Sequence, residues 1–249
     1  MALIAPPSPR AAAVGAGRGW PVLGVLVLAA LFAAAPTPAA ADRPCPVRAP
    51  RIRLAVVDKP VEVTGTQSID AMHAESGERR TARRHHLALT TSRVEWHSEL
   101  NAHVSRHHAG RGRVCAVPAE VVLTLVEAQH RISIAAEVPA NGCLWREVLA
   151  HERRHAAANR ASLAVAARTA RSAANGWAER ASGHGATEEA AMAQLQAGLR
   201  RAIEPSLAAM RAARARAHAQ VDTPGEYRRL ATVCPADQAR LAARLRGGD

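Results

Sequence analysis

Residues 144–165 contain neither proline nor glycine and are rich in alanine, and this composition predicts an α-helix. At about 100° of rotation per residue, Val148, His151, Glu152 and His155 fall within an arc of roughly 100°. Two imidazole rings and a carboxylate therefore share one helix face. The fold of the chain has to provide partners for these three polar side chains.

The pattern His-Glu-x-x-His has a known chemical use. Two imidazoles one helical turn apart can bind one zinc ion, and the intervening Glu152 is placed to take a proton from a zinc-activated water molecule. The segment resembles the thermolysin-type arrangement of zinc peptidases. Arg153 and Arg154 depart from the uncharged residues usual at the two middle positions, and their angles place them away from the ligand face.

The first 41 residues predict an export signal. Arg10 and Arg18 form a basic start without acidic residues, residues 22–35 are a short apolar core, and Ala39-Ala40-Ala41 offers a cleavage site. The core is too short for a comfortable membrane span. We therefore expect a periplasmic or secreted protein without a transmembrane segment in its mature form, built as one domain from residues 42–249.

Four cysteines in the mature part suit an oxidising compartment and two disulfides, for which the sequence allows three pairings. Residues 121–126 and 131–137 have the character of two strands of a hairpin centred near residues 128–129. Reflection about that centre places Cys115 opposite Cys143. The expected pairs are therefore Cys115 with Cys143 and Cys45 with Cys234.

The net charge of +12 raises the question of nucleic-acid binding. Two of these charges belong to the signal, Lys59 is the only lysine, and aromatic residues that could stack on bases are almost absent. The composition therefore argues against a specific nucleic-acid partner. A basic surface would also suit an anionic cell envelope.

The sequence predicts an α+β fold, with a β-rich part at 42–142 and a helical part at 144–249. Further strands are expected at 51–57, 61–64 and 86–96, and a loop at 65–84. The strand at 131–137 is a candidate edge for a peptide substrate. His97, His103, His107 and His108 are expected in a polar loop without a metal site.

The helix that carries His151 is expected to reach about residue 174, and a second helix to begin near Thr187. Its buried stripe comprises Met192, Leu195, Leu199, Ile203, Leu207 and Met210, with a bend at Pro205. The two helices would form an antiparallel hairpin about residue 183, packed on an antiparallel sheet in a zincin-like arrangement.

Reflection about residue 183 places residues 211–215 level with 155–151. Residues 218–226, just beyond, are therefore expected to pass close to the two histidines, where a third metal ligand is needed. Asp222, His218 and Glu226 are the main candidates, and Glu179 or Glu188 remain as alternatives. Glu226 also completes a capping box that begins at Thr223. Asp222 has no such local role and is the preferred ligand.

A resemblance to one family rests on the segment W-R-E-V-L-A-H-E-R-R-H, the Ala/Arg-rich hairpin and the later V-D-T-P-G-E-Y. Together they resemble the bacterial secreted zinc-dependent proteases of the DUF922 type, which pair His-Glu-x-x-His with Tyr-Asp-x-x-Thr-x-His. Val221-Asp222 matches the Tyr-Asp of that segment, whereas Tyr227 replaces its histidine. The resemblance implies zinc bound by His151, His155 and Asp222, and a peptide or protein substrate.

Two other functions stay open. The first is a non-catalytic envelope protein or helical interaction module, in which the two histidines hold a structural metal or none; the arginines inside the motif favour it. The second is a periplasmic polyanion binder that uses the arginine-rich surface. Tyr227 could donate a hydrogen bond to an oxyanion in a peptidase, or simply pack in the last part of the chain.

Overall fold

The computed structural model describes residues 45, 48–76, 87–107 and 113–246. Contacts divide the chain into two units, residues 1–41 and 42–249. The first unit, and with it the predicted export signal, lies outside the described residues. Among the helices of the described part, none combines the length and apolar character that a membrane crossing requires.

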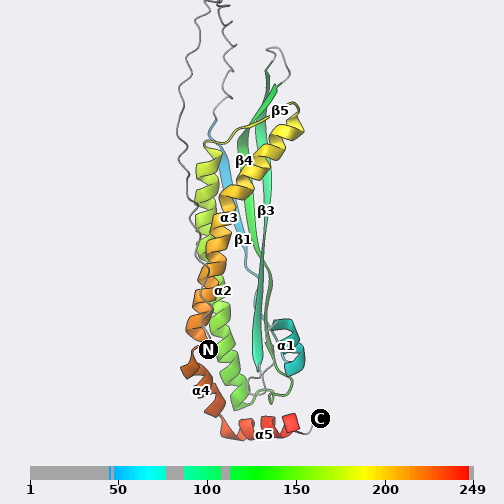
Figure 1. Cartoon of the computed structure of the whole chain (residues 1–249), viewed down its shortest axis with the longest axis vertical. Coiled ribbons are helices and arrows are strands. Elements are labelled where there is room, and N and C mark those ends of the chain that lie inside the picture. The colour runs from blue at the N-terminus through cyan, green and yellow to red at the C-terminus, as the bar shows by residue number, and fades with distance from the viewer. Residues whose placement is uncertain (1–44, 46–47, 77–86, 108–112, 247–249) are drawn as a thin grey trace, which may run out of the picture. The chain divides into compact units, whose positions relative to one another are not determined.

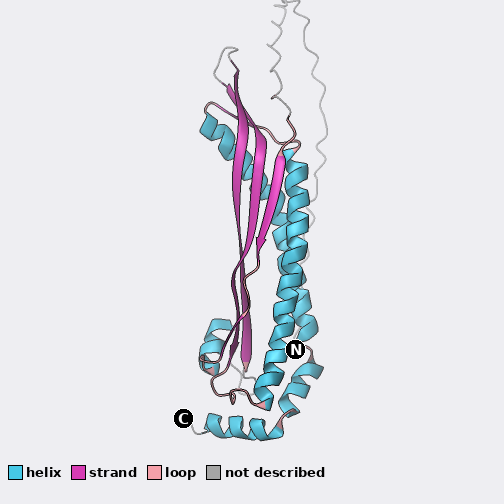
Figure 2. Ribbon diagram, turned by 180° about the vertical axis from the view of Figure 1, so that it is seen from behind, coloured by secondary structure: helices cyan, strands magenta, loops and turns pink. Residues whose placement is uncertain are grey.

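One long strand, β4 (Arg113–Ile134), forms the centre of the sheet. β3 (Ala88–His107) pairs with it antiparallel along its whole length. Three shorter strands share the other side of β4: β5 (Gly183–Gly185), β1 (Arg51–Val57) and β2 (Glu62–Thr64). β1 and β2 run parallel to β4, and β5 runs antiparallel to it, so the sheet is mixed (Figure 2).

This topology corrects the expected antiparallel sheet and its hairpin. β4 continues through residues 128–129, where a turn was expected, and residues 131–133 pair with β3 and β2 on opposite sides. Those residues of the predicted substrate edge are therefore in the centre of the sheet. The polar run from Glu127 to His130 resembled a turn, but Glu127 and His130 are buried against the helices. A turn needs solvent for its polar groups, and a buried polar layer gives the same local composition.

Two other expectations change in the same region. The polar stretch with His97 and His103 belongs to β3, not to a loop, while His108 lies outside the described residues. The expected loop at 65–84 contains the short helix α1 (Ile69–Ser76), and residues 77–86 lie outside the described part. Ile69 and Met72 bury this helix against the lower part of the sheet (Figure 1).

Two long helices, α2 (Cys143–Ala178) and α3 (Glu188–Val221), form the expected helical hairpin and lie side by side along the sheet (Figure 1). α3 begins where predicted, because the Thr187 side chain accepts a hydrogen bond from the Ala190 backbone N–H at 3.2 Å. The predicted stripe is buried from Leu195 to Met210, and Met192 is partly buried. α2 continues past the expected end near residue 174.

The last part of the chain turns under the hairpin. α4 (Pro224–Thr232) follows α3, and α5 (Pro235–Arg246) lies below the first turn of α2 (Figure 1). The buried carboxylate of Asp237 on α5 accepts a hydrogen bond from the Leu144 backbone N–H at 2.9 Å. This contact satisfies an orphan donor at the start of α2 and places a negative charge at the positive end of its dipole.

The disulfides are Cys45–Cys115 and Cys143–Cys234. The expected pairs Cys115–Cys143 and Cys45–Cys234 were wrong because they depended on a hairpin that β4 does not form. The first disulfide attaches the segment before β1 to the sheet. The second joins the start of α2 to the start of α5, beside the Asp237 contact.

The interior between sheet and helices contains three apolar clusters, and a layer of polar residues lies between two of them. One cluster contains Ile132, Ile134 and Val148, and the other contains Leu123, Leu125, Leu163 and Leu199. The buried polar residues between them lie on β4 and α2, namely Glu127, His130, His151, Glu152, His155 and Asn159. Burying this many polar groups is costly unless each finds a partner, so this layer is where a functional site is expected.

Candidate metal centre

The face of α2 that carries His151, Glu152 and His155 is buried, as the rotation per residue predicts. Val148 and Ala156 pack in the lower apolar cluster, and this packing fixes the rotation of the helix. His151 and His155 then face the segment that joins α3 to α4, whereas Glu152 contacts β3. These three residues offer ligand atoms within 4.8 Å of one another and could hold a metal ion.

Asp222 reaches the two histidines from the C-terminal end of α3. Its Oδ1 lies 3.2 Å from His151 Nε2 and 3.1 Å from His155 Nε2. The two Nε2 atoms are themselves 3.2 Å apart. Three atoms of the kinds that bind metals thus form a nearly equilateral triangle.

The size of this triangle fits a tetrahedral ion. Zinc binds nitrogen and carboxylate oxygen at about 2.0–2.1 Å, so two ligand atoms of a tetrahedral site lie about 3.3 Å apart. The observed separations of 3.1, 3.2 and 3.2 Å are close to that value. Both histidine side chains are almost completely buried, whereas the Asp222 side chain is 33 % exposed, so the fourth position would face the more open side.

His151 has a second carboxylate behind it. Its Nδ1 lies 3.4 Å from Oε1 of Glu226, and Arg154 contacts both groups. Hydrogen bonds from Arg229 and then from Arg154 lower the pKa of Glu226 to about 2, so its carboxylate is ionised at neutral pH. The Glu226 carboxylate favours the tautomer that leaves a lone pair on Nε2, whereas Arg154 Nη2, 3.1 Å from the same Nδ1, can only donate and favours the opposite tautomer.

His155 is supported by a chain of hydrogen bonds. Its Nδ1 lies 2.5 Å from Nδ1 of His218, and the two ring planes make an angle of 26° with their centroids 4.7 Å apart. Nε2 of His218 lies 3.0 Å from Oδ1 of the buried Asn159. If His218 donates to Asn159, its Nδ1 accepts from His155, and His155 also carries its lone pair on Nε2.

These contacts have one electrostatic consequence. In the tautomers that metal binding requires, two Nε2 lone pairs and a carboxylate oxygen face one another at about hydrogen-bond distance, with no proton between them. Burial also lowers the pKa values of His155 and His218, although Asp222 opposes this effect for both. A divalent cation between the three atoms would satisfy all of them at once.

Glu152 is held by the sheet. Its Oε2 accepts a hydrogen bond of 2.7 Å from the Thr90 hydroxyl on β3, and its main-chain oxygen lies 3.3 Å from the same hydroxyl. This contact orients a buried carboxylate beside the two histidines without neutralising it. Tyr227 lies farther out, with its ring centroid 6.1 Å from that of His151, and is half exposed.

Of the residues proposed from the sequence, Asp222, His218 and Glu226 all converge on the two histidines, in three different positions. Asp222 is in the place of a ligand, and the other two lie behind the histidines. Glu179 and Glu188 lie near the turn of the hairpin, at the other end of α2 and α3. Sequence reasoning missed Thr90 and Asn159. Asn159 could have been found, because it follows His151 and His155 at the same four-residue spacing.

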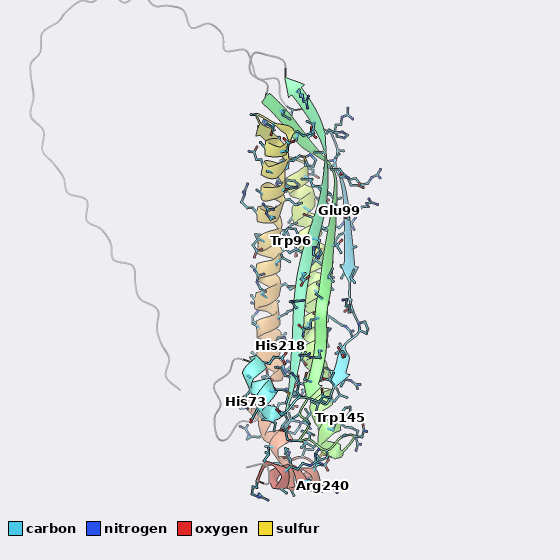
Figure 3. All side chains as sticks on the ribbon, turned by 90° about the vertical axis from the view of Figure 1, so that its right-hand side faces the viewer. His73, Trp96, Glu99, Trp145, His218 and Arg240 are labelled. Carbon is cyan, nitrogen blue, oxygen red and sulfur yellow. A yellow bond between two sulfur atoms is a disulfide. The ribbon has the colours of Figure 1, made fainter. Side chains whose placement is uncertain are left out.

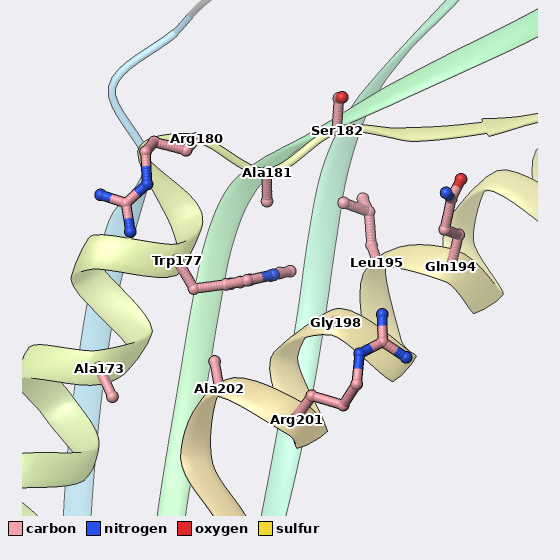
Figure 4. A pocket seen from close by; sticks show the side chains of 10 residues that line it. All are labelled: Ala173, Trp177, Arg180, Ala181, Ser182, Gln194, Leu195, Gly198, Arg201 and Ala202. Atoms are coloured by element: carbon pink, nitrogen blue, oxygen red, sulfur yellow. The ribbon is translucent and has the colours of Figure 1, made fainter. Parts of the chain in front are cut away.

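A cavity of about 460 Å³ lies at the turn of the helical hairpin, away from the metal centre. Figure 4 shows Trp177 extending from α2 towards Gly198 and Leu195 of α3, with Arg180 and Arg201 at the sides. It contains no histidine or carboxylate among its lining residues. Its chemistry therefore does not match that of the metal centre.

Comparisons of the chain with protein-family models, with curated proteins and with solved structures found no match. The geometry of the site is thus the main support for a function.

Proposed function

We propose that this protein is an exported zinc-dependent peptidase. The observation that carries the proposal is the triangle of His151 Nε2, His155 Nε2 and Asp222 Oδ1, with sides of 3.1–3.2 Å. Glu226 and His218 support the two imidazoles from behind, which is the usual second layer around a zinc site. Three protein ligands and an accessible fourth position are typical of catalytic zinc, whereas structural zinc usually has four protein ligands.

In this mechanism, bound zinc would supply an acidified water molecule and polarise the peptide carbonyl. Glu152 takes a proton from that water and then donates it to the leaving amine. The Thr90 hydroxyl donates to Oε2 of Glu152 and orients the carboxylate. His151 and His155, with Asp222, would hold the zinc ion.

Separate observations support export and the class of substrate. The two disulfides suit an oxidising compartment, and the segment before residue 42 has the composition of an export signal. The basic surface favours association with an anionic envelope over a specific nucleic-acid partner. A peptide or protein substrate follows from the zinc-water-glutamate chemistry, and the sequence resemblance supports the same class.

The test combines metal analysis with turnover on untagged protein. We expect the protein to bind zinc at the proposed centre, and His155→Ala to remove that zinc. Glu152→Gln should retain the zinc while cleavage of a mixed peptide library falls roughly 100- to 10,000-fold, because only the proton acceptor is lost. Equal zinc content in wild-type and His155→Ala protein would contradict the metal centre, and equal cleavage by Glu152→Gln would contradict the catalytic role.

The burial of the histidines supports a second candidate, a non-catalytic envelope protein with a structural metal. Only 5 % of the His151 side chain and 8 % of the His155 side chain are exposed, and Arg154 contacts Glu226 beside them. This function predicts zinc binding at the proposed centre that His155→Ala abolishes, with no peptide cleavage by either wild-type protein or Glu152→Gln. The same experiment therefore separates the two functions.

A further inference from the structure

A second group of buried polar residues lies on β4, next to the metal centre. The pairing of β3 with β4 shifts between Arg93 and Val94, which pair with Gln129 and Glu127, so that Ala128 has no partner in the register. Such a bulge reverses the alternation of side chains along the strand. As a result, Glu127 and His130 both point into the interior, where they are 0 % and 4 % exposed.

His130 is unusual within this group. Neither of its ring nitrogens has a hydrogen-bond partner among the described residues, although the ring is buried. A neutral imidazole has one donor and one acceptor, and leaving both unpaired in the interior is unfavourable because their hydration is lost without compensation. A residue of this kind on a central strand calls for a partner that is not a protein side chain.

Asp58 brings a third ligand group to the same place. Parallel pairing aligns Val57 with Val126, so Asp58 follows β1 directly beside Glu127. Ligand atoms of Asp58, Glu127 and His130 all lie within 4.8 Å of one another. Because the Asp58 side chain is 44 % exposed, the group can be reached from solvent.

Arg160 and Arg214 each pair with one of these two carboxylates. Arg160 pairs with Asp58 at 3.2 Å in an exposed contact, which contributes little to stability. Arg214 lies 3.4 Å from Oε2 of Glu127, and Ser92 donates to the other oxygen. Neither arginine makes a hydrogen bond to His130, so a ring nitrogen without a hydrogen-bond partner lies within 4.8 Å of two carboxylates.

We propose that Asp58, Glu127 and His130 form a second binding site for a divalent transition-metal ion. One imidazole and two carboxylates suit zinc or manganese, in contrast to the softer thiolate sites. The site shares no ligand with His151, His155 and Asp222. A metal ion at this site would join the end of β1 to the bulge of β4. Arg214, which contacts Glu127, also donates to the main-chain oxygen of Asn159 at 3.1 Å, and Asn159 in turn contacts His218 at the first centre.

The experiment uses the untagged full chain in the His155→Ala background, stripped with a chelator and titrated with zinc by equilibrium dialysis. We expect one equivalent of zinc to bind, and the added change Asp58→Asn to weaken this binding at least tenfold. Asp58 is at the surface, so this variant should fold. The control Glu62→Gln changes an exposed carboxylate on the neighbouring β2 and should leave the affinity unchanged.

A His155→Ala protein that binds no zinc would overturn the proposal. It would also be overturned if Asp58→Asn and Glu62→Gln gave the same affinity as their parent. A third variant, His130→Ala, should abolish the binding, with circular dichroism to check that the chain is folded. The result does not depend on the proposed peptidase: if wild-type protein binds one equivalent that His155→Ala retains and His130→Ala loses, the second site stands while the first fails.

Discussion

The two ends of the α2–α3 hairpin are built differently. At the turn, Trp177 and Leu195 pack the helices together, and Gly183 lies so close to α3 that an added Cβ would be 2.1 Å from the Ala191 carbonyl oxygen. At the other end, His155 of α2 contacts His218 of α3, and Asp222 lies within hydrogen-bond distance of His155. Figure 3 shows His218 on this part of α3.

This difference separates the sources of stability and function. Apolar contact at the turn stabilises the hairpin whether or not any ligand is present. The polar end buries histidines and a carboxylate, which contribute to stability only when hydrogen bonds or a cation compensate their lost hydration. Changes at the turn should therefore alter the free energy of unfolding, and changes at the polar end should alter metal affinity.

The largest effect is expected for Asp222→Ala. Because Asp222 is in the place of the third ligand, zinc affinity should fall more than about 100-fold, beyond the usual effect of a supporting residue. Zinc titration against a chromophoric chelator measures this change. The matched control is Glu204→Ala on the exposed surface of the same helix. If both variants bind zinc equally well, Asp222 is not a ligand.

Gly183→Ala tests the turn. The added methyl group would overlap the backbone of α3, and we expect a loss of about 2–3 kcal/mol in the free energy of unfolding. Gly65→Ala is the control, since nothing lies within 4 Å of its added Cβ. Denaturant unfolding gives both values. Zinc affinity of the folded Gly183→Ala protein should match wild type, and a large change in that affinity would mean that the two ends are not independent.

His218→Ala should have a smaller effect on zinc than Asp222→Ala. His218 contacts Nδ1 of His155, on the side of the ring away from the proposed metal, and loss of such a supporting residue typically weakens metal binding 10- to 100-fold. The exposed His97 on β3 gives the control His97→Ala. A loss as large as that of Asp222→Ala would indicate that His218, not Asp222, binds the metal.

The smallest effect is expected on the stability of the metal-free protein when the pH is lowered. Burial holds the pKa values of His155 and His218 below 6.5, so the unfolded chain takes up protons first as the pH falls. Stability from these two residues is therefore present above pH 6.5 and is lost progressively below it. Thermal unfolding of metal-free protein between pH 7.5 and pH 5 should show this decrease. The double variant His155→Gln, His218→Asn should respond less to pH, and an unchanged slope would contradict the assignment.

The helical half could be predicted from the sequence because its geometry is regular. Two antiparallel helices rise equally per residue, so reflection about residue 183 was enough to bring residues 218–226 beside His151 and His155. The face of α2 and the cap at Thr187 follow from local patterns. Whether Asp222 binds zinc remains a prediction.

The sheet was harder to predict because its decisive features are not local. Glu127 and His130 look like turn residues until the bulge and the facing helices are known. The predicted disulfide pairs were wrong because they were derived from a hairpin centred near residues 128–129, and β4 continues through those residues. Thr90 gives no signal in sequence, since a threonine in a strand is ordinary and only the packing of α2 on β3 brings it to Glu152.

The disulfide Cys143–Cys234 encloses the proposed metal ligands and their supporting residues on α2, α3 and α4 within one covalent ring. Closing a ring of this size restricts the unfolded chain by roughly 4–5 kcal/mol. Before that bond forms, α5 is attached to the start of α2 only by contacts such as that of Asp237. Oxidation would thus be a maturation step that favours assembly of the metal centre, linking its completion to the arrival of the chain in an oxidising environment.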